Sequence, residues 1–257
     1  MPVTDWRSCC QTGVKTLNRD GLTLVEIMVV ITIIGLLFAL LLPVLSRAKA
    51  RAQQIQCINN LHQFGTGLQN FLADNHGYIS TLGTPGDDYP GTWLRQLQKY
   101  GFGNDKTTNF STTGVWRCPA AHFGDWVTRL PPGVRPSYYV YNTFGFGPKT
   151  NSLGLGGNYN PNNGTYTRTR ESDVLVPSEM MAFGDSFNGG ISFSRAPLDQ
   201  LENEGNTTTR HHGRGNVVFC DGHTESPTLQ FLFTDTNDEA LSRWNRDHRP
   251  HLELVLP

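Results

Sequence analysis

Residues 21–45 read GLTLVEIMVVITIIGLLFALLLPVL, and this stretch decides the fold. From Ile27 to Leu42 it contains sixteen consecutive residues without a charged side chain. A helix needs about 20 predominantly apolar residues to cross a bilayer. The segment from Leu22 to Leu45 has that length and carries a single charge, Glu26. The stretch therefore predicts one membrane-spanning helix near the N-terminus.

Three interpretations of this segment are open. A secretory signal peptide has a shorter apolar core and a small-residue cleavage site after it, whereas this run ends in LLPV at residues 41–44. A plain single-pass anchor fits the length, but it leaves the carboxylate of Glu26 in or beside lipid, where an ionised group is costly. Basic residues do not decide the orientation, because three lie on each side of the run: Arg7, Lys15 and Arg19 before it, and Arg47, Lys49 and Arg51 after it.

The third interpretation rests on a resemblance. The sequence GLTLVE from Gly21 to Glu26, followed at once by the apolar run, resembles the N-terminus of type IV prepilins and type II secretion pseudopilins. In that family a prepilin peptidase on the cytoplasmic face cuts after the glycine and methylates the new N-terminus. The resemblance implies a cleaved leader over residues 1–21, a cut between Gly21 and Leu22, and N-methylation of Leu22. Leu22 departs from the phenylalanine that the family usually has there.

Cleavage at this point gives Glu26 a partner. The new amine on Leu22 would lie four residues before Glu26, or about 6 Å along the helix axis at about 1.5 Å per residue. A carboxylate in an apolar environment is tolerated when a cation pairs with it. We expect Glu26 of one subunit to pair with the Leu22 amine of its neighbour, and this pairing would fix the register of an assembly.

The helical pattern continues after the membrane segment. Apolar residues recur at steps of three and four, which marks an amphipathic helix: Ile55, Ile58, Leu61, Phe64, Leu68 and Phe71 or Leu72. The run Asp74–Gly77 predicts its end, with the glycine as terminator. One helix is therefore expected from Leu22 to about Ala73. It has a membrane half over residues 22–45 and an amphipathic half within residues 46–76, with a kink at Pro43.

Residues 77–257 are predicted to form a small α+β domain with an antiparallel sheet, long loops and the amphipathic half-helix packed on it. A helix is expected over residues 92–100, strands over 115–118, 137–141 and 180–183, and a long loop over 144–167. A hairpin is expected at about 215–226, with Asp221 and Gly222 as two turn residues at positive φ. A capping box from Thr236 to Glu239 predicts a short helix at about 237–245.

The C-terminal part carries a second resemblance. His211 is followed, after nine residues, by Asp221-Gly222. This motif resembles the C-terminal His-x9-Asp-Gly element of a bacterial group of pseudopilin-like proteins.

Cys57 and Cys118 would both lie outside the cytoplasm, where cysteine pairs tend to oxidise. We expect a disulfide between them, with two buried free thiols as the alternative. Cys220 is expected to be a packed hairpin residue.

The same region supplies candidate ligands for a divalent cation: Asp185, His211, Asp221 and His223. Three of them also have a structural interpretation: Asp221 suits the turn, Asp185 suits a loop cap, and His211 suits hydrogen bonds to loop carbonyls. No other cofactor is expected.

Composition and motifs narrow the function. The chain has 21 basic and 22 acidic residues, and this balance argues against nucleic-acid binding. The sequence has no Gly-x-Ser-x-Gly, His-Glu-x-x-His, P-loop or EF-hand pattern, so we do not expect an enzyme.

The expected function is that of a structural subunit of a pseudopilus or pilus-like fibre, in the cytoplasmic membrane with its C-terminal domain outside. The resemblance implies other pilin-like subunits, the peptidase, a platform protein and an assembly ATPase as partners. Two alternatives are a monomeric membrane-anchored binding module, which uses exposed aromatics such as Tyr159 and Tyr166, and a surface hydrolase with a metal at the hairpin.

Overall fold

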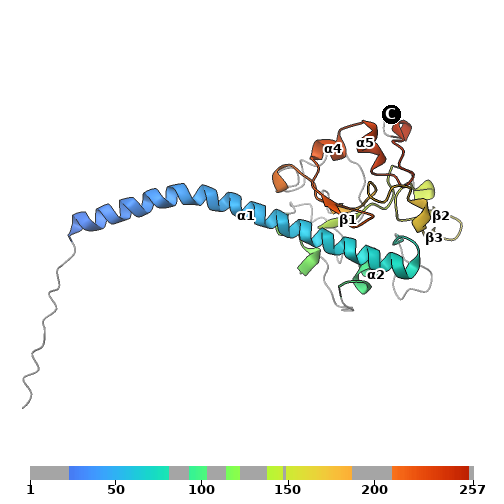
Figure 1. Cartoon of the computed structure of the whole chain (residues 1–257), viewed down its shortest axis with the longest axis horizontal. Helices are drawn as coiled ribbons and strands as arrows, with labels where there is room; N and C mark the ends of the chain where they lie inside the picture. Colours follow the sequence, from blue (N-terminus) through green and yellow to red (C-terminus); the bar gives the residue numbers. More distant parts are fainter. Residues whose placement is uncertain are drawn as a thin grey trace, which may run out of the picture. The chain divides into compact units, whose positions relative to one another are not determined.

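The computed structural model describes residues 23–80, 93–102, 114–121, 138–146, 149–186 and 210–254 (Figure 1). The chain divides into two compact units, Met1–Arg47 and Ala48–Pro257. The long helix α1 (Leu24–Asn75) contributes residues to both units. The leader expected over residues 1–21 lies outside the described residues.

Helix α1 includes Pro43 without interruption, and the hydroxyl of Ser46 donates a hydrogen bond to the Pro43 carbonyl at 3.0 Å. The kink expected there stays a prediction. The helix ends at Asn75, two residues later than expected, and His76 adopts the left-handed conformation with φ 50°. The predicted stop within Asp74–Gly77 is therefore confirmed, but the left-handed residue is His76, and Gly77 forms an isolated bridge with Arg170.

The apolar stripe on the second half of α1 is confirmed from Leu61 onward. Its buried residues are Cys57, Asn60, Leu61, Phe64, Gly65, Gly67, Leu68, Phe71 and Leu72. Ile55 was wrongly included, since its side chain is 58% exposed. The polar residue Asn60 is buried, although the pattern did not include it. Its side-chain amide donates hydrogen bonds to the Arg117 carbonyl and the Tyr139 hydroxyl, each at 2.9 Å.

Four strands form an antiparallel sheet in the order β1-β4-β5-β6. These are β1 (Tyr139–Tyr141), β4 (Met181–Asp185), β5 (Val217–Phe219) and β6 (Thr224–Glu225). Tyr139 pairs with Asp185, and an irregularity between Met181 and Phe183 shifts the register against β5. This is the α+β arrangement expected from the sequence, with a long N-terminal helix and a small antiparallel sheet.

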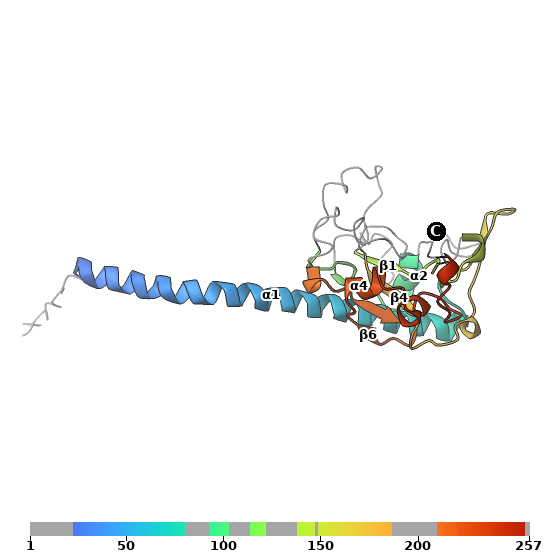
Figure 2. The same cartoon turned by 90° about the horizontal axis from the view of Figure 1, so that it is seen from above.

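Both faces of the sheet are covered. One face contributes side chains such as Tyr139 and Val218 to a core shared with the second half of α1 and with α2 (Trp93–Lys99). The opposite face, which includes Val140 and Phe219, packs against α4 (Leu229–Phe233) and Trp244, which follows α5 (Asp238–Ser242). In Figure 2, which is seen from above, α4 and the sheet are drawn over the second half of α1.

The first core is built around Phe64, which is fully buried. Five aromatic rings have centroids within 5.0–6.2 Å of the Phe64 ring: Trp93, Phe102, Trp116, Tyr139 and Phe183. Aromatic pairs at such separations contribute about 0.5–1.5 kcal/mol each beyond their burial. Next to Phe64, Gly65 lets the sheet approach closely, since a Cβ there would lie 2.9 Å from Val218 Cγ2 and 3.0 Å from the Gly222 carbonyl oxygen.

Two expected elements were wrong. Residues 115–118 do not form a strand; the chain instead makes a short 3-10 helix, η1 (Gly114–Trp116), which places Trp116 on Phe64. Residues 144–167 are not one long loop. They contain η3 (Lys149–Asn151) and a hairpin of β2 (Asn158–Asn160) and β3 (Thr165–Thr167).

Two smaller details of the C-terminal part also differ from expectation. Asp221 is not at positive φ, and only Gly222 is, at 94°; because the Phe219 amide donates to the His223 carbonyl, the turn has three residues instead of two. The cap of α5 is Asn237, whose side chain accepts from the Ala240 amide at 2.9 Å, and not Thr236. The remaining short helices are η4 (Glu171–Asp173), η5 (Arg210–His212) and η6 (Leu252–Leu254).

Candidate functional site: the exposed helix and a buried polar cluster

The first candidate site is the N-terminal part of α1. Its large apolar side chains are exposed from Leu24 to Leu45, with Leu24 at 75% and Leu40 at 67%. An 18-residue window of this helix has a mean hydropathy of 3.0, and none of that window is buried. By length and composition, α1 is the one helix in the described part of the chain that is able to cross a membrane.

Glu26 lies in the first turn of α1, where it forms a reciprocal cap with Thr23. The backbone amide and the hydroxyl of Thr23 both donate to Glu26 Oε2 at 2.8 Å. The Glu26 amide in turn points to the Thr23 hydroxyl at 3.3 Å. This is a capping box of the form Thr-x-x-Glu. The sequence carries that signature at residues 23–26, and our reading of the sequence did not use it.

Gly21 and Leu22, the expected cleavage and methylation sites, lie outside the described residues. The expected pairing of Glu26 with an amine on Leu22 therefore remains a prediction. Within the described chain, Thr23 supplies the hydrogen bonds to this carboxylate.

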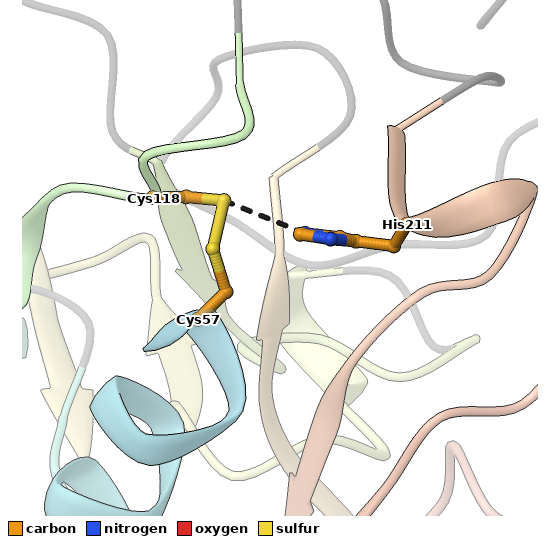
Figure 3. A group of neighbouring side chains, drawn as sticks. All are labelled: Cys57, Cys118 and His211. Carbon is orange, nitrogen blue, oxygen red and sulfur yellow. Dashed lines mark hydrogen bonds between the residues drawn. A yellow bond between two sulfur atoms is a disulfide. The ribbon is translucent and has the colours of Figure 1, made fainter. Parts of the chain in front are cut away.

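The second candidate site lies in the interior of the second unit. Cys57 on α1 and Cys118 after η1 form a disulfide with Cα atoms 5.2 Å apart, and both residues are fully buried. The imidazole of His211, on η5, lies against this disulfide with Nε2 3.4 Å from Cys118 Sγ (Figure 3). His211 adopts the left-handed conformation, with φ 54°, which non-glycine residues rarely occupy.

Asp185, the last residue of β4, completes the cluster. Its Oδ2 atom lies 3.4 Å from His211 Nε2 and accepts hydrogen bonds from the backbone and side-chain amides of Asn216 at 2.8 and 2.9 Å. Burial by itself would raise the pKa of Asp185, but the guanidinium of Arg210 and hydrogen bonds from His211 and Asn216 hold it below its ordinary value. Asp185 is therefore an ionised carboxylate in the interior.

The four candidate cation ligands fall in two places. His211 and Asp185 are buried together, whereas Asp221 and His223 lie on the β5–β6 turn with side chains 39% exposed. There His223 Nδ1 is 2.6 Å from Asp221 Oδ1, and the imidazole stacks on Phe219. Gly222 supplies the positive φ of this turn. The neighbours of His211 and Asp185 are therefore Cys57 and Cys118, and not Asp221 and His223.

Cys220 is the remaining cysteine in the described part of the chain. It is buried beneath the sheet as expected, and burial raises the pKa of its thiol well above the usual range. A protonated, inaccessible thiol is a poor nucleophile. Cys220 is therefore a packing residue.

Comparison with known proteins agrees with the features of α1. The family model described as "Prokaryotic N-terminal methylation motif" matches residues 17–42. The type II secretion system core protein G of Pseudomonas aeruginosa is 27% identical over 126 residues, which are 49% of this chain and 82% of that protein. The protein of the same name from Escherichia coli K12 is 39% identical over 64 residues, 25% of this chain and 44% of that protein.

A third relative has a different name. The fimbrial protein EcpB of Eikenella corrodens is 34% identical over 96 residues, 37% of this chain and 58% of that protein. The alignments with the last two relatives thus span about half of each protein's length. No solved structure matches the chain. The methylation motif, the exposed apolar helix and these relatives support a membrane-anchored, pseudopilin-like protein.

Proposed function

We propose that the chain is a subunit of a type II secretion pseudopilus or of a related pilus-like fibre. In this proposal a prepilin peptidase cuts between Gly21 and Leu22 and methylates Leu22. The chain is held in the cytoplasmic membrane by residues 22–45, with the domain from residue 77 outside. A platform protein and an assembly ATPase then drive stacking of these helices with those of other pilin-like subunits.

One observation carries the proposal: an unbroken apolar surface on α1 that begins with a lone carboxylate. Apolar side chains from Leu24 to Leu45 are exposed along the whole segment, and such a surface must be covered by lipid or by other helices. Glu26 is the only charge in that segment. Its placement in the first turn favours a role in register, because a cation on a neighbouring subunit would lower the cost of an intramembrane carboxylate.

The names of the relatives favour secretion over adhesion. Two of the three relatives described above carry the name type II secretion system core protein G, and the one named as fimbrial aligns with a smaller part of this chain than the first. We therefore place the pseudopilus first among the fibres that such a subunit builds.

Mass spectrometry of the N-terminus tests this proposal. The full chain is expressed in a host that contains a prepilin peptidase and is extracted from membranes. N-methylated Leu22 is the expected N-terminus, and a Gly21→Val variant should keep its leader. Intact Met1 on the wild-type chain in that host would contradict the proposal.

The interior cluster supports a structural role over a hydrolytic one. In a nucleophile–histidine–acid triad the nucleophile and the acid meet opposite nitrogens of the imidazole. Here Cys118 and Asp185 both face Nε2 of His211, and the cysteine is bonded to Cys57.

A second candidate function is a membrane-anchored binding module that does not polymerise. The β2–β3 hairpin favours it, since Tyr159 and Tyr166 are directly opposite each other with ring centroids 5.2 Å apart, and residues 161–164 at its tip are exposed. This alternative predicts a monomer whose behaviour is unchanged by substitution of Glu26.

A further inference from the structure

The buried disulfide has the surroundings of a metal site. Sγ of Cys57, Sγ of Cys118 and a ring nitrogen of His211 all lie within 4.8 Å of one another, and all three residues are buried. They come from three segments that are far apart in the sequence: α1, the chain after η1, and η5 (Figure 3). Two cysteines and one histidine are typical ligands of zinc.

Asp185 stands where a fourth ligand is needed. Its Oδ2 atom is 3.4 Å from His211 Nε2, and within the described residues its Oδ1 atom has no hydrogen-bond partner. Tetrahedral zinc with bonds of about 2.0–2.3 Å places neighbouring ligand atoms about 3.3–3.8 Å apart. The separations of 3.4 Å from His211 Nε2 to Cys118 Sγ and to Asp185 Oδ2 match two edges of such a tetrahedron.

We propose that reduction of the Cys57–Cys118 disulfide converts this cluster into a Zn²⁺ site. Its ligands are the two thiolates, Nε2 of His211 and the carboxylate of Asp185. A dithiol reductant supplies two electrons and two protons and itself becomes a disulfide, which leaves two cysteine thiols. Zn²⁺ then displaces the two thiol protons and binds both sulfurs. Oxidation by a disulfide reverses the sequence: the two thiolates pass two electrons to the oxidant, which takes up two protons from solvent and becomes two thiols, the sulfurs rejoin, and Zn²⁺ leaves.

The surrounding charges suit this ligand set. Two thiolates and one carboxylate around Zn²⁺ leave a net charge of −1. The guanidinium of Arg210 is buried, with 4% exposure, and interacts electrostatically with Asp185, so it offsets that charge. Thiolate and imidazole ligands also select zinc over magnesium or calcium, which prefer oxygen ligands.

Groups that would hold the zinc ligands in position are already present. The two hydrogen bonds from Asn216 fix the carboxylate of Asp185, as the outer partners of metal ligands do. The consecutive left-handed residues His211 and His212, at φ 54° and 58°, hold the imidazole against the sulfurs. Backbone strain of this kind persists where the surroundings over-determine a conformation.

Metal titration of the full chain in detergent tests the proposal. Cys9→Ser and Cys10→Ser are introduced so that the two other N-terminal thiols do not compete. Oxidised and phosphine-reduced samples are titrated with Zn²⁺ against a chromophoric chelator, and with Co²⁺, whose absorption reports thiolate ligands and tetrahedral geometry. The variants are His211→Ala and Asp185→Asn, and the matched control is His62→Ala, since His62 is exposed on α1.

The reduced chain is expected to bind one Zn²⁺, with a thiolate-to-cobalt absorption band, and the oxidised chain none. His211→Ala and Asp185→Asn should each weaken binding at least tenfold, a size typical of lost support at a metal site, and His62→Ala should not change it. Equal binding by oxidised and reduced chains would overturn the proposal. So would full affinity in His211→Ala, or no binding by the reduced chain.

Near-UV circular dichroism and the unfolding temperature show whether the reduced chain and the variants keep the fold. A ligand that binds only the folded state stabilises it by mass action, so Zn²⁺ should raise the unfolding temperature of the reduced chain and leave that of the oxidised chain unchanged. A reduced chain that has lost its aromatic signal should regain it on addition of Zn²⁺. Failure to regain it would count against the site.

Discussion

Thr23 and Glu26 hold each other at the start of α1: the amide and the hydroxyl of Thr23 both donate to the same carboxylate oxygen of Glu26, at 2.8 Å. The residue proposed to align subunits therefore also caps its own helix. These two roles depend on different properties. A capping box accepts glutamine in place of glutamate, whereas pairing with a neighbour's amine requires the charge. Substitutions at the two positions thus separate helix capping from assembly.

Loss of the cap should affect the helix start only. Thr23→Val removes the hydroxyl that donates to Glu26 and faces the Glu26 amide. Loss of an N-cap side chain costs about 0.5–2 kcal/mol of helix stability. We expect faster hydrogen exchange at residues 25–28 in detergent micelles and unchanged exchange at residues 61–72. Unchanged exchange at the helix start would show that the capping box contributes nothing there.

The disulfide should account for a large part of the stability of the second unit. Cys57 and Cys118 are 61 residues apart in the sequence, and removal of a native disulfide typically costs about 2–5 kcal/mol. Cys118→Ser should lower the free energy of unfolding in urea by this amount. Wild-type chain that is reduced in the presence of a chelator should show the same loss. Equal midpoints for the oxidised and Cys118→Ser chains would contradict the prediction.

Gly65 should not tolerate a methyl group. A Cβ at this position would meet Val218 and the backbone of Gly222 at 2.9–3.1 Å, and overpacking of this kind costs about 1–3 kcal/mol. Alanine is favoured over glycine within a helix by about 1 kcal/mol, so the net loss in Gly65→Ala should be smaller. Gly101→Ala is the matched control, because its nearest contact would be 3.6 Å. A Gly65→Ala chain that is more stable than the wild type by the full helix-propensity gain of about 1 kcal/mol would refute the close approach.

The C-terminal end of the described chain should loosen as the pH rises. His251 lies between two carboxylates, with Nε2 2.7 Å from Asp247 and Nδ1 3.0 Å from Glu253. Partial burial alone would lower the pKa of His251, but these carboxylates raise it above its ordinary 6.5. A raised folded-state pKa stabilises the fold fully below the unfolded pKa and loses this contribution as the pH rises through the folded value.

The His251 prediction is checked by an NMR titration. The imidazole should titrate above pH 6.5, and hydrogen exchange at residues 247–254 should accelerate as the pH rises through that titration, after correction for the intrinsic rate. Asp247→Asn should lower the pKa of His251 and weaken the pH dependence, since Glu253 remains. A midpoint for His251 at or below 6.5 would be inconsistent with the two ion pairs.

The regular parts of the fold were predictable from residue pattern. The apolar run after Glu26 predicts the membrane half of α1. The spacing of Leu61, Phe64 and Leu68 predicts its amphipathic half. The β-rich runs around Val140 and Phe183 predict β1 and β4. These features depend on neighbours a few residues away, and such neighbours are visible in one sequence.

Other parts depended on contacts that the sequence does not display. The run of residues 115–118 has strand-forming side chains, yet Cys118 is tied to Cys57 and Trp116 packs on Phe64, so the chain turns instead of extending. The Gly/Asn-rich segment pairs across Tyr159 and Tyr166 into a hairpin. Tertiary context of this kind overrides local propensity.

The candidate site was predictable in part. His211 and Asp185 were both singled out, and they do lie together. The sequence linked them to Asp221 and His223, because these residues are close to His211 along the chain. The structure instead brings them to Cys57 and Cys118, since η5 and the end of β4 meet at the disulfide. The capping role of Thr23 is a further feature that the sequence does display, because Thr-x-x-Glu at residues 23–26 is the local signature of a capping box.

The most direct test of the central claim is fibre formation by Glu26→Gln in a host with the assembly machinery. This substitution keeps the cap and removes the charge; Thr23→Val removes part of the cap and keeps the charge; Glu179→Gln controls for loss of an exposed carboxylate in the second unit. Subunits are quantified in the sheared-fibre fraction, and equal N-terminal processing is verified by mass spectrometry. The account predicts at least a tenfold loss for Glu26→Gln and wild-type levels for the other two. Fibres of Glu26→Gln at wild-type abundance would contradict it.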